Sequence, residues 1–464
     1  MRSMDASAHF RGKKITVMGL GLLGGVGDIA YIAGCGADII ATDLKNEKEL
    51  KPSLEMLKKF PNIRYTLGRH DLADFRGRDL VIKAPSTPSD SLFIAEARKN
   101  GTTITMWAAL FARFAREAGA TIVGVTGTRG KTTVTAMIAA ILRADGRNVI
   151  EGGNVHGTSL LPQLANVSAE TVAVLELDSW KLQGFGEAKM SPNIGVFTTF
   201  YPDHLNYYGS TPLTTGKNAM DAYLADKANI FLHQKSDDTL ILGKQCAPTI
   251  VEKYGDRMEA KTFVVDELKL PDTWTLCIPG MHNRYNASLA LAAIRSLPAG
   301  RQGAMQISDE VNRHALETFT GVPGRLELIR EVNGIKIYND TTSTTPEATN
   351  VAVTALSDVG RGTSHIILVM GGTDKGLDMS ALLAKLPELK RVILLAGSGT
   401  ERVRDELSDA PVYDALAPAV EDAFAHAEAG NIILFSPAFT SFGMFKNEFD
   451  RGDQFVALVK KFVA

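Results

Sequence analysis

A glycine-rich loop that carries a lysine and several threonines could hold the phosphates of a nucleoside triphosphate. It reads Thr126-Gly127-Thr128-Arg129-Gly130-Lys131-Thr132-Thr133. In loops of this composition, backbone N–H groups face the anion, the lysine reaches the outer phosphates, and a hydroxyl can bind magnesium. The strict motif has a glycine where this chain has Val125. An ordinary strand-to-helix turn is the disfavoured alternative, so we predict that the protein uses a nucleoside triphosphate.

A second glycine loop, near the N-terminus, has the spacing of a diphosphate-binding site. The chain reads Gly19-Leu20-Gly21-Leu22-Leu23-Gly24 after an apolar run, and Asp43 ends the next such run. This pattern is the fingerprint of a Rossmann unit, which an NAD-dependent dehydrogenase would use. Because the loop at 126–133 already supplies an energy source, we interpret the second loop as a site for a nucleotide-linked substrate. NAD binding is the alternative.

Two side chains that can bind metal ions follow apolar runs in the central region. Glu176 comes directly after the run 171–175, and His204 follows the run 193–200. Ligands of α/β sheets gather at the carboxyl ends of strands, and two such groups beside a phosphate loop favour magnesium coordination. Each residue alone could equally be a solvated strand end.

Lys227 lies on the apolar side of a predicted helix, 217–231, where a core residue would be expected. A lysine is rarely buried without a partner. From the pattern alone, a lysine that reaches solvent from the edge of this face is an equal alternative. Further along, Asn283 and Asn286 lie one turn apart in another predicted helix and could bind a nucleotide base. N-capping would also explain Asn283.

Strand-like and helix-like segments alternate along the chain and predict an α/β protein. Its 464 residues suggest about three domains. The strand-like runs that position the polar residues are 14–18, 37–42, 80–83, 122–125, 171–175, 193–200, 335–338, 365–370, 392–396 and 432–435.

The bulk composition is that of a globular protein, with 45% hydrophobic and 22% charged residues. A formal net charge of -2 gives no reason to expect a nucleic acid or an anionic membrane as partner. Cys35, Cys246 and Cys277 are widely spaced, which fits a reducing compartment. The first residues lack a signal-peptide core, and no apolar run approaches the roughly 18 residues that cross a bilayer. We therefore expect a soluble, cytoplasmic protein.

Taken together and in order, these segments resemble the Mur ligase family, the ATP-dependent enzymes that add amino acids to peptidoglycan precursors. The loop 127–132 resembles the family's phosphate loop, and Gly152-Gly153-Asn154 resembles its substrate-binding GGN segment. The resemblance implies ATP, magnesium and a carbamylated Lys227, with Lys131, Glu176, His204 and Lys227 in catalytic roles. It assigns to ATP the residues Gly127, Thr128, Arg129, Gly130, Lys131, Thr132, Thr133, Asn283, Asn286, Arg325 and Asp340, and to magnesium Thr132, Glu176, His204 and Lys227.

The resemblance also implies three α/β domains. The expected boundaries are 1–110 for a Rossmann-like domain that binds the UDP substrate, 111–321 for a central P-loop ATPase-type domain, and 322–464 for a C-terminal Rossmann-like domain that binds the amino acid. A monomer is expected, with small-molecule substrates and neither nucleic acid nor membrane as partner.

The C-terminal segments resemble the branch of the family that adds D-glutamate to UDP-N-acetylmuramoyl-L-alanine. The segment 371–375 matches its GG-x-x-K motif, and the stretch 436–452 matches its SPA-x-x-S, FKN and RG motifs. The resemblance implies that Lys375 holds the incoming glutamate and that Ser441 binds its side-chain carboxylate. The implied substrate-binding positions are Leu22, Leu23, Asp43, Asn154, Thr344, Lys375, Ser441 and Phe449.

Several positions around the expected substrate cleft depart from that branch. Asp178 and Lys181 stand where serine and glutamine are typical, and Thr342 stands where a lysine is typical. Leu23 replaces a common hydroxyl residue, and Glu448 replaces a usual aromatic. A ligase that adds another acceptor, such as L-glutamate, to the same nucleotide is therefore the alternative.

Two further classes remain as weaker alternatives. A ligase like folylpolyglutamate synthase would lack the second threonine of the phosphate loop and the N-terminal UDP-binding domain. A regulatory ATP-binding protein without catalysis is disfavoured because Glu176, His204 and Lys227 are all present.

Overall fold

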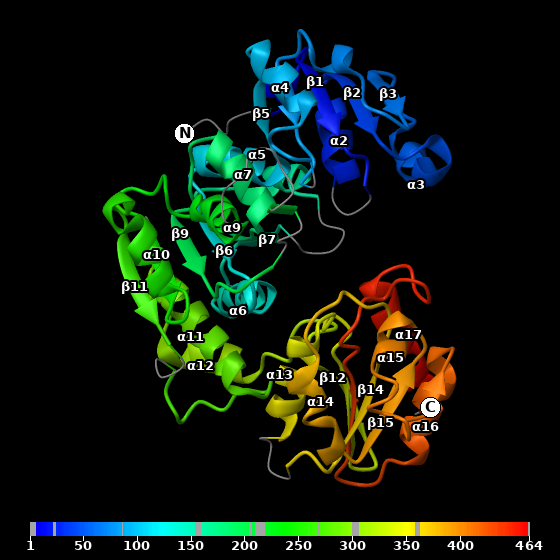
Figure 1. Cartoon of the computed structure of the whole chain (residues 1–464). Coiled ribbons are helices and arrows are strands. Elements are labelled where there is room, and N and C mark those ends of the chain that lie inside the picture. Colours follow the sequence, from blue (N-terminus) through cyan, green and yellow to red (C-terminus); the bar gives the residue numbers. More distant parts are fainter. Residues whose placement is uncertain are drawn as a thin grey trace. The chain divides into compact units, whose positions relative to one another are not determined.

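The computed structural model describes residues 6–21, 25–85, 87–153, 159–203, 207–208, 219–266, 270–298, 306–357 and 362–462. The chain divides into two compact units (Figure 1). Unit 1 comprises residues 1–271 and 286–315, and unit 2 comprises residues 272–285 and 316–464. Three sheets confirm the α/β class: two lie in unit 1 and one lies in unit 2.

The first sheet of unit 1 is parallel, with the order β3-β2-β1-β4-β5. Strand order reverses between β1 and β4, and open α/β sheets bind their ligands at such a switch point. The strands are β1 (Lys14–Met18), β2 (Asp38–Asp43), β3 (Ile63–Leu67), β4 (Leu80–Ile82) and β5 (Thr103–Thr105). The helices of this part are α1 (Ala6–Phe10), α2 (Gly25–Gly34), α3 (Glu47–Leu57) and α4 (Leu92–Lys99).

The second sheet of unit 1 is also parallel, with the order β11-β10-β9-β6-β8-β7. Its strands are β6 (Thr121–Thr126), β7 (Val149–Gly152), β8 (Val172–Glu176), β9 (Ile194–Phe197), β10 (Thr239–Gly243) and β11 (Lys261–Val265). The helices are α5 (Trp107–Glu117), α6 (Lys131–Ala144), α7 (Ser179–Glu187), α9 (Ala219–Ala228) and α10 (Ala247–Tyr254). Helices α11 (Met281–Arg295) and α12 (Asp309–Glu317) each have residues in both units.

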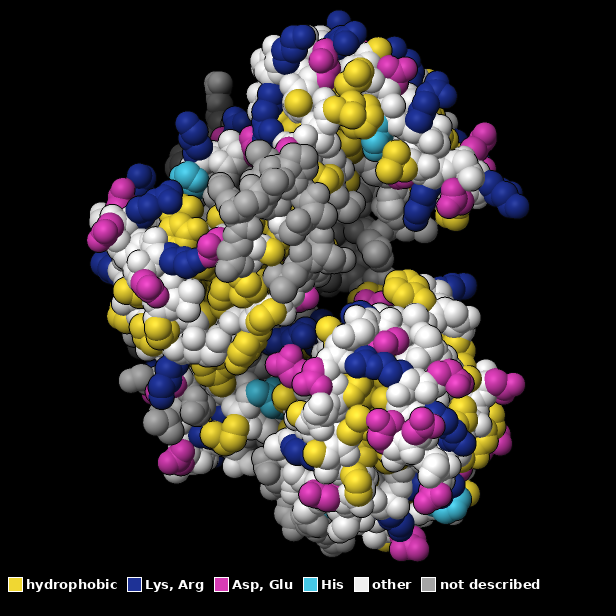
Figure 2. Space-filling model, viewed as in Figure 1, with side chains coloured by type: hydrophobic (Ala, Val, Ile, Leu, Met, Phe, Trp, Pro, Cys, Tyr) yellow, Lys and Arg dark blue, Asp and Glu magenta, His cyan; other side chains and the backbone are white. Residues whose placement is uncertain are grey.

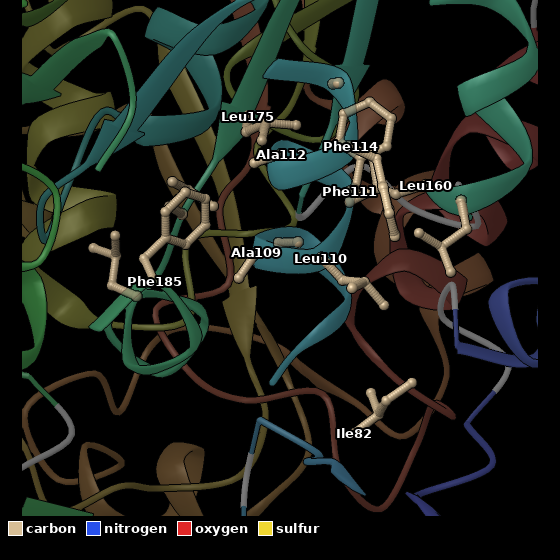
Figure 3. Packing of buried hydrophobic residues seen from close by; sticks show 14 of the residues in the cluster. Ile82, Ala109, Leu110, Phe111, Ala112, Phe114, Leu160, Leu175 and Phe185 are labelled. Atoms are coloured by element: carbon tan, nitrogen blue, oxygen red, sulfur yellow. The ribbon is translucent and has the colours of Figure 1, made fainter. Parts of the chain in front are cut away.

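Helix α5 joins the cores of the two sheets. Its Phe111 and Phe114 are buried, and they belong to one hydrophobic cluster with Ile82 of β4 and Leu175 of β8 (Figure 3). Apolar side chains on nearly every side of a short helix mean that the helix lies inside a core rather than on its surface. The first two sheets are therefore held together by a shared hydrophobic core.

The sheet of unit 2 has the order β12-β13-β17-β14-β15-β16. Only the pair β12 and β13 is antiparallel among its described strand pairs. Alternate residues of β14 face two separate clusters: Leu368 packs with α13 and α14, whereas Val369 packs with α16 and α17. The elements are β12 (Glu327–Val332), β13 (Ile335–Asn339), β14 (Ile366–Gly371), β15 (Arg391–Leu395), β16 (Val412–Tyr413), β17 (Ile432–Phe435), α13 (Pro346–Ser357), α14 (Ser380–Leu383), α15 (Ser398–Arg402), α16 (Leu416–Ala425) and α17 (Glu448–Phe462).

The surface carries both signs of charge in close mixture. Figure 2 shows lysine, arginine, aspartate and glutamate side chains interspersed over the visible face of each unit. This mixture agrees with the small net charge of -2. In the part of the chain that the structure describes, no helix has the length and apolar character needed to span a bilayer.

Candidate active site

The phosphate loop connects β6 to α6 at the centre of the second sheet. Two of its glycines allow close packing that a side chain would prevent. A Cβ at Gly127, whose φ is +139°, would lie 2.0 Å from Oγ1 of Thr198. A Cβ at Gly130, whose φ is +85°, would lie 2.5 Å from Oδ1 of Asn286. Because Lys131 begins α6, the loop ends at a helix N-terminus, where an anion is stabilised.

The segment that follows β9 fixes the shape of this loop. The Thr128 N–H donates to the Thr199 carbonyl at 2.7 Å, and the Arg129 N–H donates to Oγ1 of Thr199 at 2.9 Å. The Thr198 hydroxyl donates to the Arg129 carbonyl at 2.5 Å. Nζ of Lys131 donates to the Thr128 carbonyl at 3.0 Å, so the lysine lies along the loop.

Lys227 lies beneath the phosphate loop and not at the edge of its helix. Its side chain is 1% exposed, and its Nζ donates to the Gly127 carbonyl at 2.8 Å and lies 3.4 Å from Oγ1 of Thr126. Burial lowers the pKa of this amine well below its usual value, and the charge of Lys131 lowers it further. The alternative of a lysine that reaches solvent is therefore wrong.

Glu176 ends β8 directly beside the phosphate loop, because β8 pairs with β6 and Glu176 is opposite Val125. Its side chain is 2% exposed. A Cβ at Gly153 would lie 2.0 Å from the Glu176 carbonyl oxygen, so Gly153 lies against the same strand end. Asn154 and His204, which complete the predicted substrate and metal residues here, lie outside the described residues.

Asp178 and Lys181, two of the departures from the family pattern, form an ion pair with each other. Asp178 is the N-cap of α7 and accepts a hydrogen bond from the Lys181 N–H at 2.8 Å. Nζ of Lys181 lies 2.5 Å from Oδ2 of Asp178. Burial raises the pKa of Asp178, but the Lys181 charge and hydrogen bonds outweigh it, so the net pKa is lowered. The two substitutions thus neutralise each other's charge.

Asp43 closes the first glycine loop from the end of β2. Its Oδ2 accepts from the Leu20 N–H at 2.7 Å, and its Oδ1 accepts from the Lys45 N–H at 2.9 Å. Both bonds hold the carboxylate at the switch-point end of the sheet. Leu22 and Leu23, the other predicted substrate residues of this loop, lie outside the described residues.

The two asparagines of α11 have different environments. Asn286 is 6% exposed and lies against the phosphate loop at Gly130. Asn283 is the third residue of α11, and its Nδ2 donates to the Pro279 carbonyl at 2.7 Å. It is therefore inside the first turn, and the N-cap interpretation is wrong.

Asp340 organises the loops at the ends of β13 and β17 in unit 2. It accepts from the Leu326 N–H at 2.9 Å and from the hydroxyls of Ser343 and Ser436 at 2.5 and 2.7 Å. Burial raises its pKa to about 6, although these donors and Arg325 oppose that rise. Arg325 itself is exposed, one residue before Leu326.

Two loops of unit 2 bring the predicted acceptor residues onto one edge of the sheet. Thr373 and Thr440 exchange backbone hydrogen bonds at 3.0 and 3.1 Å, which joins the loop of Lys375 to the loop of Ser441. Nζ of Lys375 donates to Oγ1 of Thr344 at 3.2 Å. Ser441 is 3% exposed, whereas Phe449, in the first turn of α17, is 37% exposed.

Comparison with known proteins assigns the chain to a family. Residues 125–263 match the model of the Mur ligase middle domain, and residues 324–439 match that of the Mur ligase glutamate ligase domain. The UDP-N-acetylmuramoylalanine–D-glutamate ligase of Roseiflexus sp. is 35% identical over 97% of this chain and 99% of its own length. The chain belongs to the Mur ligase family. As a member, it is an ATP-dependent amide ligase, as the sequence predicts.

Other comparisons agree with this assignment of the Mur ligase. The ligase of the same name from Borreliella afzelii is 34% identical over 96% of each chain. Among solved structures, the UDP-N-acetylmuramate–alanine ligase of Thermotoga maritima shares the fold, with a TM-score of 0.58, 18% identity and coverage of 97% of this chain and all of that one. The MurF ligase of Thermotoga maritima, solved with ADP, has a TM-score of 0.53 at 19% identity and covers 85% and 96% of the two chains.

The donors beside the phosphate loop of this Mur ligase fit magnesium. Magnesium prefers oxygen ligands, and it usually retains waters and substrate phosphates in place of a complete protein cage. Glu176 supplies a buried carboxylate, and Thr132 supplies a hydroxyl in the first turn of α6. The described residues include no group of three or more His, Cys, Asp and Glu side chains placed to hold a metal.

Sequence reasoning gave no individual role to two residues that shape these sites. The Tyr223 ring lies 4.7 Å from Nζ of Lys227, and its hydroxyl lies 3.4 Å from Oγ1 of Thr128. Arg451 is fully buried and donates to the carbonyls of Thr341 and Phe439 at 2.7 and 3.1 Å. In the sequence, Tyr223 cannot be distinguished from other core aromatics. Arg451 could have been recognised, because it is a charged residue at the spacing of the buried face of α17, with Phe455 and Val459.

Replacing Arg451 by methionine should lower the free energy of unfolding by about 2–4 kcal/mol, because two buried carbonyls lose their donor. The change is measured by urea unfolding of the full chain. Lys446→Met, at an exposed position of the same region, is the matched control and should change stability by less than about 0.5 kcal/mol. Equal stability of the two variants would contradict a structural role for the Arg451 guanidinium.

Proposed function

We propose that this Mur ligase adds D-glutamate to UDP-N-acetylmuramoyl-L-alanine with hydrolysis of ATP to ADP and phosphate, as a step of peptidoglycan precursor synthesis. The observation that carries the proposal is the pair of acceptor loops joined by Thr373 and Thr440, which bear a lysine and a buried serine on one sheet edge. A cation and a hydroxyl are the groups that recognise the two carboxylates of glutamate. The names and identities of the relatives support the same substrates.

The reaction needs an activated carboxyl group, because a carboxylate and an amine do not form an amide unaided. A carboxylate oxygen of the muramoyl-alanine substrate attacks the γ-phosphorus of ATP, and ADP leaves. The amine of D-glutamate then attacks the acyl carbon of the resulting acyl phosphate, and phosphate leaves. Positioning and charge neutralisation provide most of the catalysis of phosphoryl transfer.

The residues of unit 1 fit the first of these steps. Lys131, with its amine along the phosphate loop, would offset charge on the outer phosphates. Magnesium, when bound, would neutralise the β- and γ-phosphate oxygens, and Thr132, Glu176, His204 and modified Lys227 are its proposed ligands. The remaining proposed ATP contacts are Gly127, Thr128, Arg129, Gly130, Thr133, Asn283, Asn286, Arg325 and Asp340.

We also propose that Lys227 is carbamylated. Its neutral amine would attack carbon dioxide, forming an N–C bond and releasing one proton. The lowered pKa supports this, since only the unprotonated amine is nucleophilic. The product is an anion, whose charge would be attracted to the neighbouring cation Lys131.

The first sheet is the proposed binding site of the UDP-linked substrate. Asp43 holds the glycine loop at the switch point, where a diphosphate would lie beside the start of α2. Leu22, Leu23 and Asn154 are further proposed contacts of this substrate, and Thr344 and Phe449 are proposed contacts on the acceptor side. The proposed domain boundaries stay at 110/111 and 321/322.

We propose a monomer as the active form, since one chain carries every residue of both sites. We also place the reaction in the cytoplasm, because ATP is its energy source.

Phosphate release with ATP, magnesium and UDP-N-acetylmuramoyl-L-alanine tests the proposal, with D-glutamate, L-glutamate or no amino acid added and product mass as confirmation. Release that depends on D-glutamate is the expected result. Release only with L-glutamate would keep the ligase chemistry but overturn the acceptor. In that case Asp178, Thr342 and Glu448, which depart from the family pattern, are the first residues to revert.

A further inference from the structure

We propose that Lys83 is a positioning residue that couples the substrate-binding first sheet to Lys227 and the phosphate loop. This inference rests on the proposed function, because it assumes that the first sheet and the phosphate loop bind the two substrates of one reaction. The coupling runs through buried and part-buried hydrogen bonds and one peptide link, between Asp226 and Lys227. Two of its hydrogen bonds, Lys83–Gln183 and Lys227–Gly127, each join residues that are 100 positions apart in the sequence.

Lys83 stands at the switch point of the first sheet. It directly follows β4, next to β1 and its glycine loop, and its side chain is 2% exposed. Its ammonium group donates to the Thr87 carbonyl at 2.6 Å and to Oε1 of Gln183, in α7, at 2.7 Å. The Lys83 cation, at the place where the sheet should bind its ligand, is thus hydrogen-bonded to α7.

Gln183 transmits the contact to the helix that carries Lys227. Its Nε2 donates to Oδ2 of Asp226, in α9, at 2.6 Å, and the Tyr208 hydroxyl donates to the same oxygen at 2.9 Å. Asp226 immediately precedes Lys227, whose Nζ donates to the Gly127 carbonyl at 2.8 Å. Two hydrogen bonds from Lys83 to Asp226, the peptide link from Asp226 to Lys227, and the Lys227–Gly127 hydrogen bond therefore connect the end of β4 to the phosphate loop.

Lys83 and Asp226 are buried charged groups, and each depends on its hydrogen-bond partners in this set of contacts. Burial lowers the pKa of Lys83 to about 8, and Arg98 acts in the same sense; Asp226, Glu187 and Asp178 oppose them. The pKa of Asp226 is raised by burial, against the influence of Gln183, Tyr208 and both lysines. A buried polar group that loses its partner costs far more than the bond itself contributes. The Lys83–Gln183–Asp226 arrangement is thus held in one geometry.

The functional consequence is a link between substrate binding at the first sheet and the position of Lys227. A ligand at the switch point contacts the segments that follow β1 and β4, and any shift of Lys83 is passed to α9 through Gln183. The position of Lys227 under Gly127 then depends on whether the first sheet is occupied.

Hydrogen exchange and kinetics of Lys83→Met, Gln183→Met and their double variant test this inference in the full-length protein. We expect Lys83→Met to lower kcat about 10-fold or more, while the KM for ATP and the KM for the UDP-linked substrate each change less than about 3-fold. We also expect it to accelerate amide exchange in the segment 121–133. Gln183→Met should do the same, and the double variant should show no further loss, because both act along one route. Lys99→Met, an exposed lysine of α4, is the matched control and should behave as wild type.

Exchange that accelerates only within 80–90, or a kcat within about 2-fold of wild type in both single variants, would overturn the inference. Strictly additive losses in the double variant would also overturn it. The exchange measurement does not depend on turnover, so it decides the role of Lys83 even if the wild type releases no phosphate with D-glutamate. A wild type that releases no phosphate with D-glutamate would count against the proposed function alone.

Discussion

Lys131→Ala should reduce turnover on the order of 1000-fold or more while leaving the fold intact. Removing a single hydrogen-bond donor from a developing charge already costs about 100- to 1000-fold, and here a full positive charge is lost. The Lys131 side chain is half-buried and makes its hydrogen bond within the phosphate loop, so the core of α6 is not altered. Steady-state phosphate release is the measurement, with circular dichroism and thermal unfolding to confirm the fold.

The same helix offers a matched control. Arg143 lies in the last turn of α6 and pairs with Glu151 at 2.8 Å, with its side chain 55% exposed. Arg143→Ala removes a cation from α6 at the end remote from the phosphate loop, and it should keep turnover within about 2-fold of wild type. Substantial activity of Lys131→Ala would remove the phosphate loop from the mechanism.

Lys227→Ala should also abolish turnover, and short carboxylic acids at high concentration should restore part of it. The alanine leaves a space beneath Gly127 that a small carboxylate can occupy, and that carboxylate replaces the anionic group of a carbamate. Lys227→Met removes the amine but fills most of the space, so it should be equally inactive and respond less to the added acid. Phosphate release across a series of acid concentrations provides the measurement.

Bicarbonate supplies an independent test of the carbamate. Wild-type enzyme depleted of carbon dioxide should lose activity and regain it when bicarbonate is added, and ¹³C-labelled bicarbonate should give a carbonyl NMR signal that Lys227→Met lacks. If neither depletion nor added acid has any effect, Lys227 acts as an unmodified amine.

The elements that position the phosphate loop were predictable because their signals are local. The run 122–125 lies within β6, which leads into this loop, and the run 335–338 lies within β13. The runs 14–18 and 432–435 match β1 and β17 residue for residue, since a buried parallel strand is a short apolar run. Strand β11 was not predicted. Its Phe263, Val264 and Val265 are apolar, yet four of its five residues are exposed, so it is not a fully buried strand of the kind that the other runs indicated.

The candidate site was predictable only in part. The sequence shows the chemistry of each residue, but which residues it contacts depends on the fold. Lys227 could be marked as unusual from its place on an apolar helix face, but whether it was buried depended on Gly127, which is 100 positions away. The sequence likewise presented Asp178 and Lys181 as two separate departures. Their pairing appears only when the first turn of α7 is built, with Asp178 as its N-cap.

The ion pair in the first turn of α7 has an evolutionary consequence. Asp178 and Lys181 side chains are only 15% and 14% exposed, so a chain with just one of them would hold a largely buried charge without its partner. Either order of exchange from serine and glutamine therefore passes through a less stable intermediate. The two positions form an epistatic pair, and homologous ligases should carry both charged residues or neither.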